Sequence, residues 1–384
     1  MEQVKNRFRA LLEPADIVIG GDRPWDVRVH DERLYGRILK QGTIGVGEAY
    51  MDGWWDCDAI DEMIARVFRA GVNRHIFSPL DIVRIARAKL LNLQRGERAY
   101  EIGRRHYDVG NDLYERMLDK RMIYSCGYWR AATNLDDAQE AKLALIRDKL
   151  QVEAGMRVLD IGCGWGGAAR YLAETAGCEV VGVTVSREQA TLAREMCAGL
   201  PVEIRLQDYR DIDERFDRVY SIGMFEHVGT KNHPTYMDVV RRHLRDPDSL
   251  TLLHTIGGFR SRAKTDPWIE RYIFPNSVIP SAAQITAASE AVGAPISLGT
   301  IDRIADGPES FNTQLLWDGT SGPVDRHDKK YIQPFGEWLP WRGLFEALFP
   351  VAESAGHFLA GDGSGTLETS GVVTGVATCF EVAF

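Results

Sequence analysis

The feature that most constrains the fold is a glycine-rich stretch near the middle of this 384-residue chain. An apolar run at Val158–Ile161, interrupted only by Asp160, leads into Gly162-Cys163-Gly164-Trp165-Gly166-Gly167, and a helix-like segment follows at 168–176. This order is typical of a strand, a tight turn and a helix N-terminus in a Rossmann-like βαβ unit. Glycines let the backbone approach a ligand, and the helix start offers free N–H groups. The stretch therefore predicts a site for a nucleoside-bearing cofactor.

The choice of cofactor depends on the second strand. Gly162, Gly164 and Gly167 match the dinucleotide pattern G-x-G-x-x-G, but a dinucleotide site also needs an acid where the next strand ends. That strand is expected at 179–184 and ends in Thr184. The doubled glycine after Asp-x-Gly-x-Gly is more similar to the S-adenosylmethionine-dependent methyltransferases. We therefore favour a methyltransferase over an NAD-dependent dehydrogenase, and both over a glycine turn without a ligand.

Composition and patterning exclude several classes of protein. A hydrophobic fraction of 45% and a charged fraction of 26% are ordinary for a soluble globular protein. No apolar run is long enough to span a bilayer, and segment 1–10 is charged and lacks the apolar region of a signal peptide. None of the six cysteines forms a CxxC pair, so we expect neither a metal site nor a disulfide framework. These features predict a cytoplasmic protein.

Charge is distributed unevenly along the chain. The net charge is −9, yet segment 66–105 holds ten Lys or Arg and three Asp or Glu, a local balance of +7. Ser78 and Pro79 predict the start of an amphipathic helix, and Arg84 and Arg87 lie away from its apolar stripe. Such a helix can rest on an anionic membrane or pack on the core with a solvated basic face, and the helix alone favours the second alternative. Nucleic acid is not expected, because basic and aromatic residues are not interleaved elsewhere.

The coarse pattern predicts an α/β fold, a Rossmann-like class I methyltransferase preceded by a small, mostly helical N-terminal domain at 1–105. Residues 106–290 alternate candidate strands with helical segments, as in a mostly parallel sheet covered on both faces. Residues 291–384 are harder to assign, and we group them with the catalytic domain, 106–384. The candidate strands are 156–161, 179–184, 202–206, 216–222 and 250–256.

Seven short motifs, taken together with the glycine loop, resemble the cyclopropane-fatty-acyl-phospholipid synthases, which share a catalytic core with the mycolic acid cyclopropane synthases. They occur in the family's order over roughly residues 20–290. The motifs are GVGEAYMDGWW at 45–55, HYDVGND at 106–112, YSC at 124–126, QDYRD at 207–211, GMFEHVG at 223–229, LHTIG at 253–257 and YIFPN at 272–276.

The resemblance implies a demanding reaction. A cis double bond of a phospholipid acyl chain attacks the methyl group of S-adenosylmethionine, and the resulting carbocation loses a proton and closes to a cyclopropane ring. Water must be excluded, because it would trap the cation. Aromatic faces can stabilise that cation. The candidates, each also explained by core packing, are Tyr124, Tyr128, Phe225 and Phe274.

In this family the base resembles a bound bicarbonate, and an anion in an apolar site must be held by donors and dipoles. The matching positions are Cys126, Glu226, His254 and Ile256. Cys126 and Ile256 would act through their backbones, His254 would donate a hydrogen bond, and Glu226 would share a proton or orient a donor. Without the family, Glu226 and His227 suggest either an acid/base pair or a polar strand terminus.

The resemblance also assigns residues to each part of the cofactor. It assigns Tyr124 and Ser125 to the methionine end together with Gly162 and Gly164. It places Thr184 and Gln189 near the ribose, and Asp208 and Tyr209 beside the adenine.

The C-terminal third departs from the family pattern. Where the family has a tyrosine that helps to bind bicarbonate, the best match here is Phe311, and segment 354–361 lacks the family's arginines. Two alternatives to cyclopropane formation therefore stay open. One is methyl transfer that yields methyl-branched acyl chains, and the other is a non-catalytic membrane-surface protein with a decayed site.

The implied partner is an unsaturated phospholipid in an anionic membrane surface, which a cytoplasmic protein reaches by peripheral association with the inner membrane. Segment 66–105 is then the best candidate for the docking surface. The family resemblance also suggests a homodimer.

Overall fold

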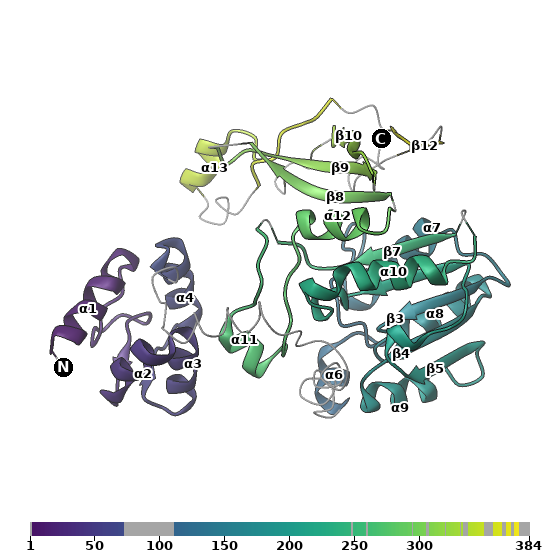
Figure 1. Cartoon of the computed structure of the whole chain (residues 1–384). Helices are drawn as coiled ribbons and strands as arrows, with labels where there is room; N and C mark the ends of the chain where they lie inside the picture. Colours follow the sequence, from purple (N-terminus) through teal and green to yellow (C-terminus); the bar gives the residue numbers. More distant parts are fainter. Residues whose placement is uncertain are drawn as a thin grey trace. The chain divides into compact units, whose positions relative to one another are not determined.

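The computed structural model describes residues 2–72, 111–246, 249–258, 260–293, 295–304, 307–318, 320–330, 332, 337–348, 356–362, 366–369 and 372–375. The chain folds as two units, coloured by sequence in Figure 1. We call Met1–His106 with Ala263–Val278 the N-terminal unit, and Tyr107–Arg262 with Ile279–Phe384 the sheet unit. The predicted basic helix, with Arg84 and Arg87, lies outside the described residues.

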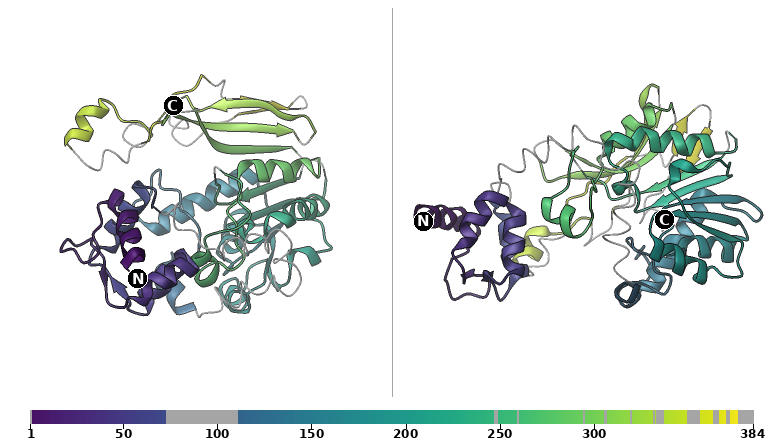
Figure 2. Two further views of the ribbon diagram at one scale, coloured as in Figure 1. Left: turned by 60° about the vertical axis from the view of Figure 1, so that its left-hand side comes forward. Right: turned by 60° about the horizontal axis from the view of Figure 1, so that its bottom comes forward.

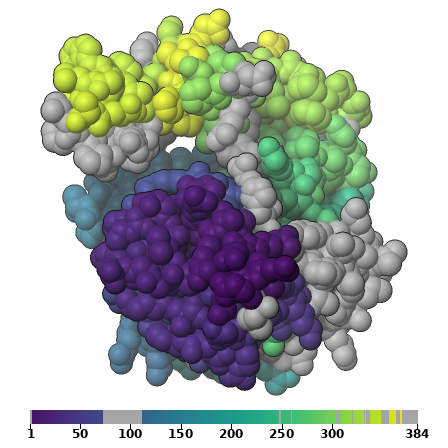
Figure 3. Space-filling view, turned by 90° about the vertical axis from the view of Figure 1, so that its left-hand side faces the viewer, coloured from purple at the N-terminus to yellow at the C-terminus, as the bar shows by residue number. Residues whose placement is uncertain are grey.

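The N-terminal unit is mostly helical, as predicted. Its elements are α1 (Glu2–Leu12), β1 (Arg28–Val29), α2 (Arg33–Gln41), α3 (Thr43–Met51), β2 (Trp55–Asp56), α4 (Ile60–Arg69) and α11 (Pro267–Tyr272). The two short strands pair antiparallel. Apolar side chains from α2, α3, β2 and α4 meet in one core that includes Leu34, Ala49, Trp55 and Met63. The purple atoms of Figure 3 show the surface of segment 2–72 of this unit.

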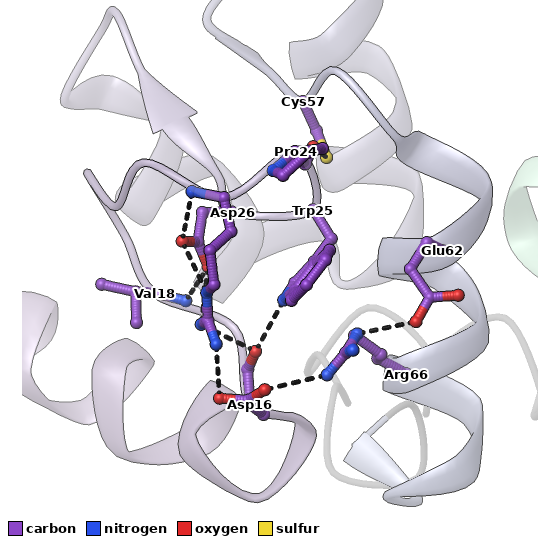
Figure 4. Close-up of polar contacts among 9 residues, drawn as sticks. Asp16, Val18, Pro24, Trp25, Asp26, Cys57, Glu62 and Arg66 are labelled. Carbon is purple, nitrogen blue, oxygen red and sulfur yellow. Dashed lines mark hydrogen bonds and ion pairs between the residues drawn. The ribbon is translucent and has the colours of Figure 1, made fainter.

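A polar network stabilises the turn before β1 (Figure 4). The buried carboxylate of Asp26 accepts a hydrogen bond from the Val18 N–H at 2.8 Å and two from the Arg23 guanidinium at 2.9 and 3.0 Å. These hydrogen bonds, the one from the Arg23 side chain above all, lower the pKa of Asp26 to about 2. The guanidinium groups of Arg23 and Arg66 both lie over the Trp25 ring, 5.1 and 4.1 Å from its centroid.

Segment 263–278 belongs to the N-terminal unit although it is remote from it in the sequence. The carboxylate of Glu48 in α3 accepts hydrogen bonds from Arg37 Nη2 at 2.7 Å and from the Tyr272 hydroxyl at 2.9 Å. It also forms an ion pair with Arg271 of α11 at 2.7 Å. The predicted boundary at 105/106 does not include this segment, because the boundary follows chain order whereas packing joins segments far apart in the sequence.

The sheet unit contains a five-stranded parallel sheet of order β5-β4-β3-β6-β7. Its strands are β3 (Arg157–Ile161), β4 (Glu179–Thr184), β5 (Val202–Leu206), β6 (Arg218–Ile222) and β7 (Leu250–His254). The strand order reverses between β3 and β6, and ligands bind outside the carboxyl ends of strands at such a switch point. The predicted Rossmann-like α/β class is confirmed.

Helices cover both faces of this sheet, as two views in Figure 2 show. They are α7 (Leu135–Leu150), α8 (Gly167–Ala176), α9 (Arg187–Met196), α10 (His233–His243) and α12 (Ala282–Glu290). The short helix α6 (Asn111–Met117) packs instead beside the glycine loop, where the rings of Tyr114 and Trp165 have centroids 4.7 Å apart. Leu143 of α7 and Leu172 of α8 belong to the core on one face. Tyr236 of α10 and Ile285 of α12 belong to the core on the other. The sheet is therefore buried on both sides, which explains its nearly continuous apolar strands.

The C-terminal part adds antiparallel strands to the sheet unit. They are β8 (Ile296–Arg303), β9 (Ser310–Asp318) and β10 (Gly322–Asp328), with α13 (Arg342–Leu348) and the pair β11 (Thr366–Thr369) and β12 (Val372–Gly375) after them. β9 lies between β8 and β10. In the described part of the chain, no helix is long and apolar enough to cross a membrane.

Candidate active site

The glycine loop joins β3 to α8 at the carboxyl edge of the sheet. Gly162 and Gly166 have φ values of +83° and +81°, a region that favours glycine. A Cβ at Gly167 would lie 1.9 Å from the Arg121 carbonyl oxygen, whereas one at Gly164 would meet no atom within 4 Å. The loop is therefore closely packed on one side and open beside Gly164, where its backbone can face a ligand.

A buried acid lies in the strand before this loop. Asp160 accepts a hydrogen bond from the Tyr220 hydroxyl at 2.7 Å, so β3 and β6 share a polar contact inside the sheet. Burial raises the pKa of Asp160 to about 7, although the Tyr220 hydrogen bond opposes the shift. Burial therefore favours the uncharged form of Asp160 more than that of an exposed aspartate.

The end of β4 carries a hydrogen-bonded pair where a dinucleotide-binding fold has an acid. The Thr184 hydroxyl donates to Gln189 Oε1 at 2.8 Å, and both residues are buried. Ser186 caps α9 by accepting the Gln189 N–H at 3.2 Å. The structure thus brings together the two residues that the resemblance places at the ribose.

The turn after β5 holds the predicted adenine positions. Asp208 accepts hydrogen bonds from the backbone N–H and the Nε of Arg210, at 3.0 and 2.8 Å. Tyr209 lies against Tyr236 with ring centroids 5.6 Å apart, and burial raises the pKa of its hydroxyl. Arg210, which the sequence analysis did not single out, therefore orients the Asp208 carboxylate.

The loop before α7 brings Tyr124, Ser125 and Cys126 to the carboxyl edge of the sheet. A Cβ at Gly223, directly after β6, would lie 3.9 Å from Ser125 Cβ. Cys126 Sγ lies 3.5 Å from Nε2 of His254, the last residue of β7. Burial and the nearby charge of Lys142 lower the pKa of His254, so its ring is neutral near pH 7.

Glu226 lies in a short turn after β6 and contacts the segment after β7. Its Oε1 accepts the Ile256 N–H at 2.7 Å. Among the described residues, its buried Oε2 has no hydrogen-bond partner, and neither does the buried Nδ1 of His254. Burial raises the pKa of Glu226, so this carboxyl holds a proton more readily than an exposed one. Unsatisfied polar atoms at the end of a strand indicate a ligand site.

Comparison with known proteins assigns this arrangement to a family. A family profile described as mycolic acid cyclopropane synthetase matches residues 94–300. The chain is 53% identical over 283 residues to the cyclopropane-fatty-acyl-phospholipid synthase of Escherichia coli (strain K12), across 73% of each protein. The chain belongs to the cyclopropane synthase family.

Two other similarities extend the comparison for this cyclopropane synthase family member. It is 32% identical to the tuberculostearic acid methyltransferase of Mycobacterium tuberculosis (strain ATCC 25618 / H37Rv), over 74% of this chain and 70% of that protein. A solved mycolic acid cyclopropane synthase complexed with SAH and CTAB is 31% identical, covers 53% of this chain and 76% of its own, and gives a TM-score of 0.47.

Two aromatic residues singled out from the sequence, Phe311 and Phe225, lie on different elements of the sheet unit. Phe311 is in β9, beyond the part of the chain that the family profile matches, and the Arg326 guanidinium lies 5.9 Å from its ring centroid. Phe225 is fully buried and stacks on His233 at 4.2 Å. The Phe225 ring therefore takes part in core packing. The role of Phe311 at a bicarbonate site stays a prediction.

Two polar residues of α7, which were not among the predicted site residues, hold the loop 123–126. Gln139 Nε2 donates to the Ser125 carbonyl oxygen at 2.7 Å, and Lys142 Nζ donates to the Ser125 hydroxyl at 2.6 Å. Both side chains are buried. The sequence does indicate that these two polar side chains are buried, because positions 139 and 142 fall on the same helical stripe as the apolar residues Leu143 and Ile146.

Proposed function

We propose that this protein transfers a methylene group from S-adenosylmethionine to the cis double bond of unsaturated phospholipid acyl chains, forming a cyclopropane ring. The observation that carries this proposal is 53% identity to a cyclopropane-fatty-acyl-phospholipid synthase across 73% of the chain. The arrangement of polar groups at the carboxyl edge of β3, β6 and β7 is consistent with it.

The residues at the sheet edge fit S-adenosylmethionine. The open side of the glycine loop at Gly164 leaves room for a ligand against the backbone, and the N-terminus of α8 favours negative charge there. The Thr184–Gln189 pair offers neutral hydrogen-bonding groups to a ribose. When bound, S-adenosylmethionine supplies an electrophilic methyl group.

The group formed by Cys126, Glu226, His254 and Ile256 fits bicarbonate, which when bound supplies the base. The two unsatisfied atoms, Glu226 Oε2 and His254 Nδ1, can share or donate a proton to an anion. The Ile256 N–H already donates to Glu226, so Ile256 would contribute its carbonyl oxygen, which accepts a hydrogen bond from a bicarbonate hydroxyl. A neutral His254 adds no charge to the site, and burial, which raises the pKa of Glu226, favours the uncharged carboxyl that would not repel an anion.

Product analysis tests the proposed reaction. The protein is incubated with unsaturated phospholipid vesicles and isotopically labelled S-adenosylmethionine, and the fatty esters are then analysed by mass. Gain of one methylene with loss of the double bond is the expected result. The same gain with a double bond retained would indicate methyl-branched chains, and no gain would indicate a non-catalytic protein.

We also propose peripheral association with the anionic inner membrane surface through segment 66–105, and assembly as a homodimer. The support for the membrane is chemical, because a phospholipid acyl chain lies in a bilayer and basic residues are attracted to an anionic leaflet. The local balance of +7 in a chain of net charge −9 would also orient the protein on such a surface.

A further inference from the structure

Lys142 is a buried amine at the candidate site to which the proposed reaction assigns no role. Its side chain projects from α7 with only 5% of the residue exposed, and its Nζ donates to the Ser125 hydroxyl at 2.6 Å. Gln139, one helical turn earlier, donates to the Ser125 carbonyl oxygen at 2.7 Å. Two side chains of α7 thus hold Ser125, one through the Ser125 carbonyl oxygen and the other through the Ser125 hydroxyl.

Ser125 lies where a cofactor and the reacting groups meet. Its Cβ is 3.9 Å from the position that a Cβ on Gly223 would take, which places Ser125 over the carboxyl end of β6. The next residue, Cys126, contacts His254 at the end of β7. A change in how Ser125 is held therefore acts directly at the ligand-binding edge of the sheet.

The chemistry of the two groups fixes the direction of their hydrogen bond. A protonated lysine can only donate, so the Ser125 oxygen must accept, and the Ser125 proton must point away from Lys142. The Ser125 hydroxyl makes no other hydrogen bond within the described residues. The hydroxyl is thereby oriented as a donor, and the ammonium behind it favours an anionic acceptor over a cationic one.

We infer that Lys142 is a positioning residue, which orients the Ser125 hydroxyl to donate a hydrogen bond to the carboxylate at the amino-acid end of S-adenosylmethionine. This inference rests on the proposed function, in which Ser125 lies at the methionine end of the cofactor. Lys142 acts through Ser125 and does not itself touch the reacting atoms.

The charge of Lys142 gives this role a pH dependence. Burial lowers the pKa of Lys142 to about 8, whereas Cys126 and Asp119 favour its charged form, and His254 faces it from β7. Above that pKa the neutral amine can accept the Ser125 proton, and the carboxylate loses its donor. Cofactor affinity should therefore be highest below about pH 8 and should fall as the pH rises through that value.

Calorimetric titration with S-adenosylhomocysteine tests the inference, because this ligand keeps the carboxylate and needs no lipid. Lys142→Met should weaken binding about tenfold and abolish the fall in affinity above the Lys142 pKa. Ser125→Ala should have a similar effect, and the double variant should be no weaker than Ser125→Ala alone. The KM for S-adenosylmethionine should rise while kcat changes little. Lys149→Met, which removes an exposed lysine of the same helix, is the matched control.

A second ligand separates positioning from simple destabilisation. 5′-Methylthioadenosine lacks the carboxylate, so Lys142→Met and the wild type should bind it equally. Equal losses for both ligands, additive effects in the double variant, or unchanged binding of S-adenosylhomocysteine would each overturn the inference. If Lys142→Met does not fold, the decision falls to Ser125→Ala, which should lose the pH dependence that the wild type shows. Failure of the wild type to bind S-adenosylhomocysteine would instead count against the proposed function.

Discussion

In the proposed bicarbonate site, Glu226 can share a proton with the bound anion through its unsatisfied Oε2. Glu226→Gln should fold normally, because the amide oxygen can still accept the Ile256 N–H. The amide can still donate a hydrogen bond to an anion, but it cannot take up or release a proton. Turnover should therefore fall about a hundredfold, as expected for loss of a positioned proton-transfer group. Turnover of labelled S-adenosylmethionine measures this loss, and calorimetry should show nearly unchanged affinity for S-adenosylhomocysteine.

The control for Glu226 is Glu179→Gln, at the exposed amino end of β4. That substitution makes the same carboxyl-to-amide exchange at the opposite edge of the sheet and should leave turnover unchanged. Wild-type turnover in Glu226→Gln would contradict the assigned role.

Asp26 makes a separate residue-scale prediction about acid stability. Its pKa is lowered from 3.8 to about 2, so its contribution is present above 3.8 and is lost as the pH falls toward 2. Asp26→Asn should destabilise the N-terminal unit by about 1–3 kcal/mol near neutral pH. In urea denaturation series, the difference between variant and wild type should shrink across that acid range. The control is Asp22→Asn, because Asp22 is exposed. This variant should be as stable as the wild type across the same pH range.

At the scale of elements, the contact between α3 and α11 depends on one glycine. A Cβ at Gly47 would lie 2.2 Å from Trp268 Nε1, so a larger residue must push the indole ring and α11 away. Gly47→Ala should therefore cost about 1–3 kcal/mol of stability and shift the tryptophan fluorescence. The measurement is chemical denaturation followed by fluorescence.

Gly36→Ala in α2 is the matched control, because a Cβ there meets no atom within 4 Å. In that open helical position alanine should stabilise the protein by about 0.5–1 kcal/mol. If both substitutions stabilise, the close approach of α3 and α11 does not require glycine.

At the scale of the whole molecule, charge asymmetry predicts how the protein reaches its substrate. Replacing Arg84, Arg87 and Arg95 by Glu should weaken binding to anionic vesicles, since each basic residue near such a surface contributes about 1 kcal/mol. Affinity for S-adenosylhomocysteine and the melting temperature should change little. Vesicle co-sedimentation at low and high salt is the measurement, because salt screens this attraction. Salt-insensitive, unchanged binding by the triple variant would mean that another surface docks.

The sequence by itself determined the sheet, the glycine loop and the family. Apolar strands and glycine turns are local patterns, so Val158–Ile161 and Gly162 could be read directly from residue order. Only the tertiary structure decided that 263–278 packs with Glu48, that the Ile256 N–H is already bonded to Glu226, and that Lys142 holds Ser125. These contacts join residues that the sequence separates, and hydrogen-bond partners and burial exist only once distant segments are brought together.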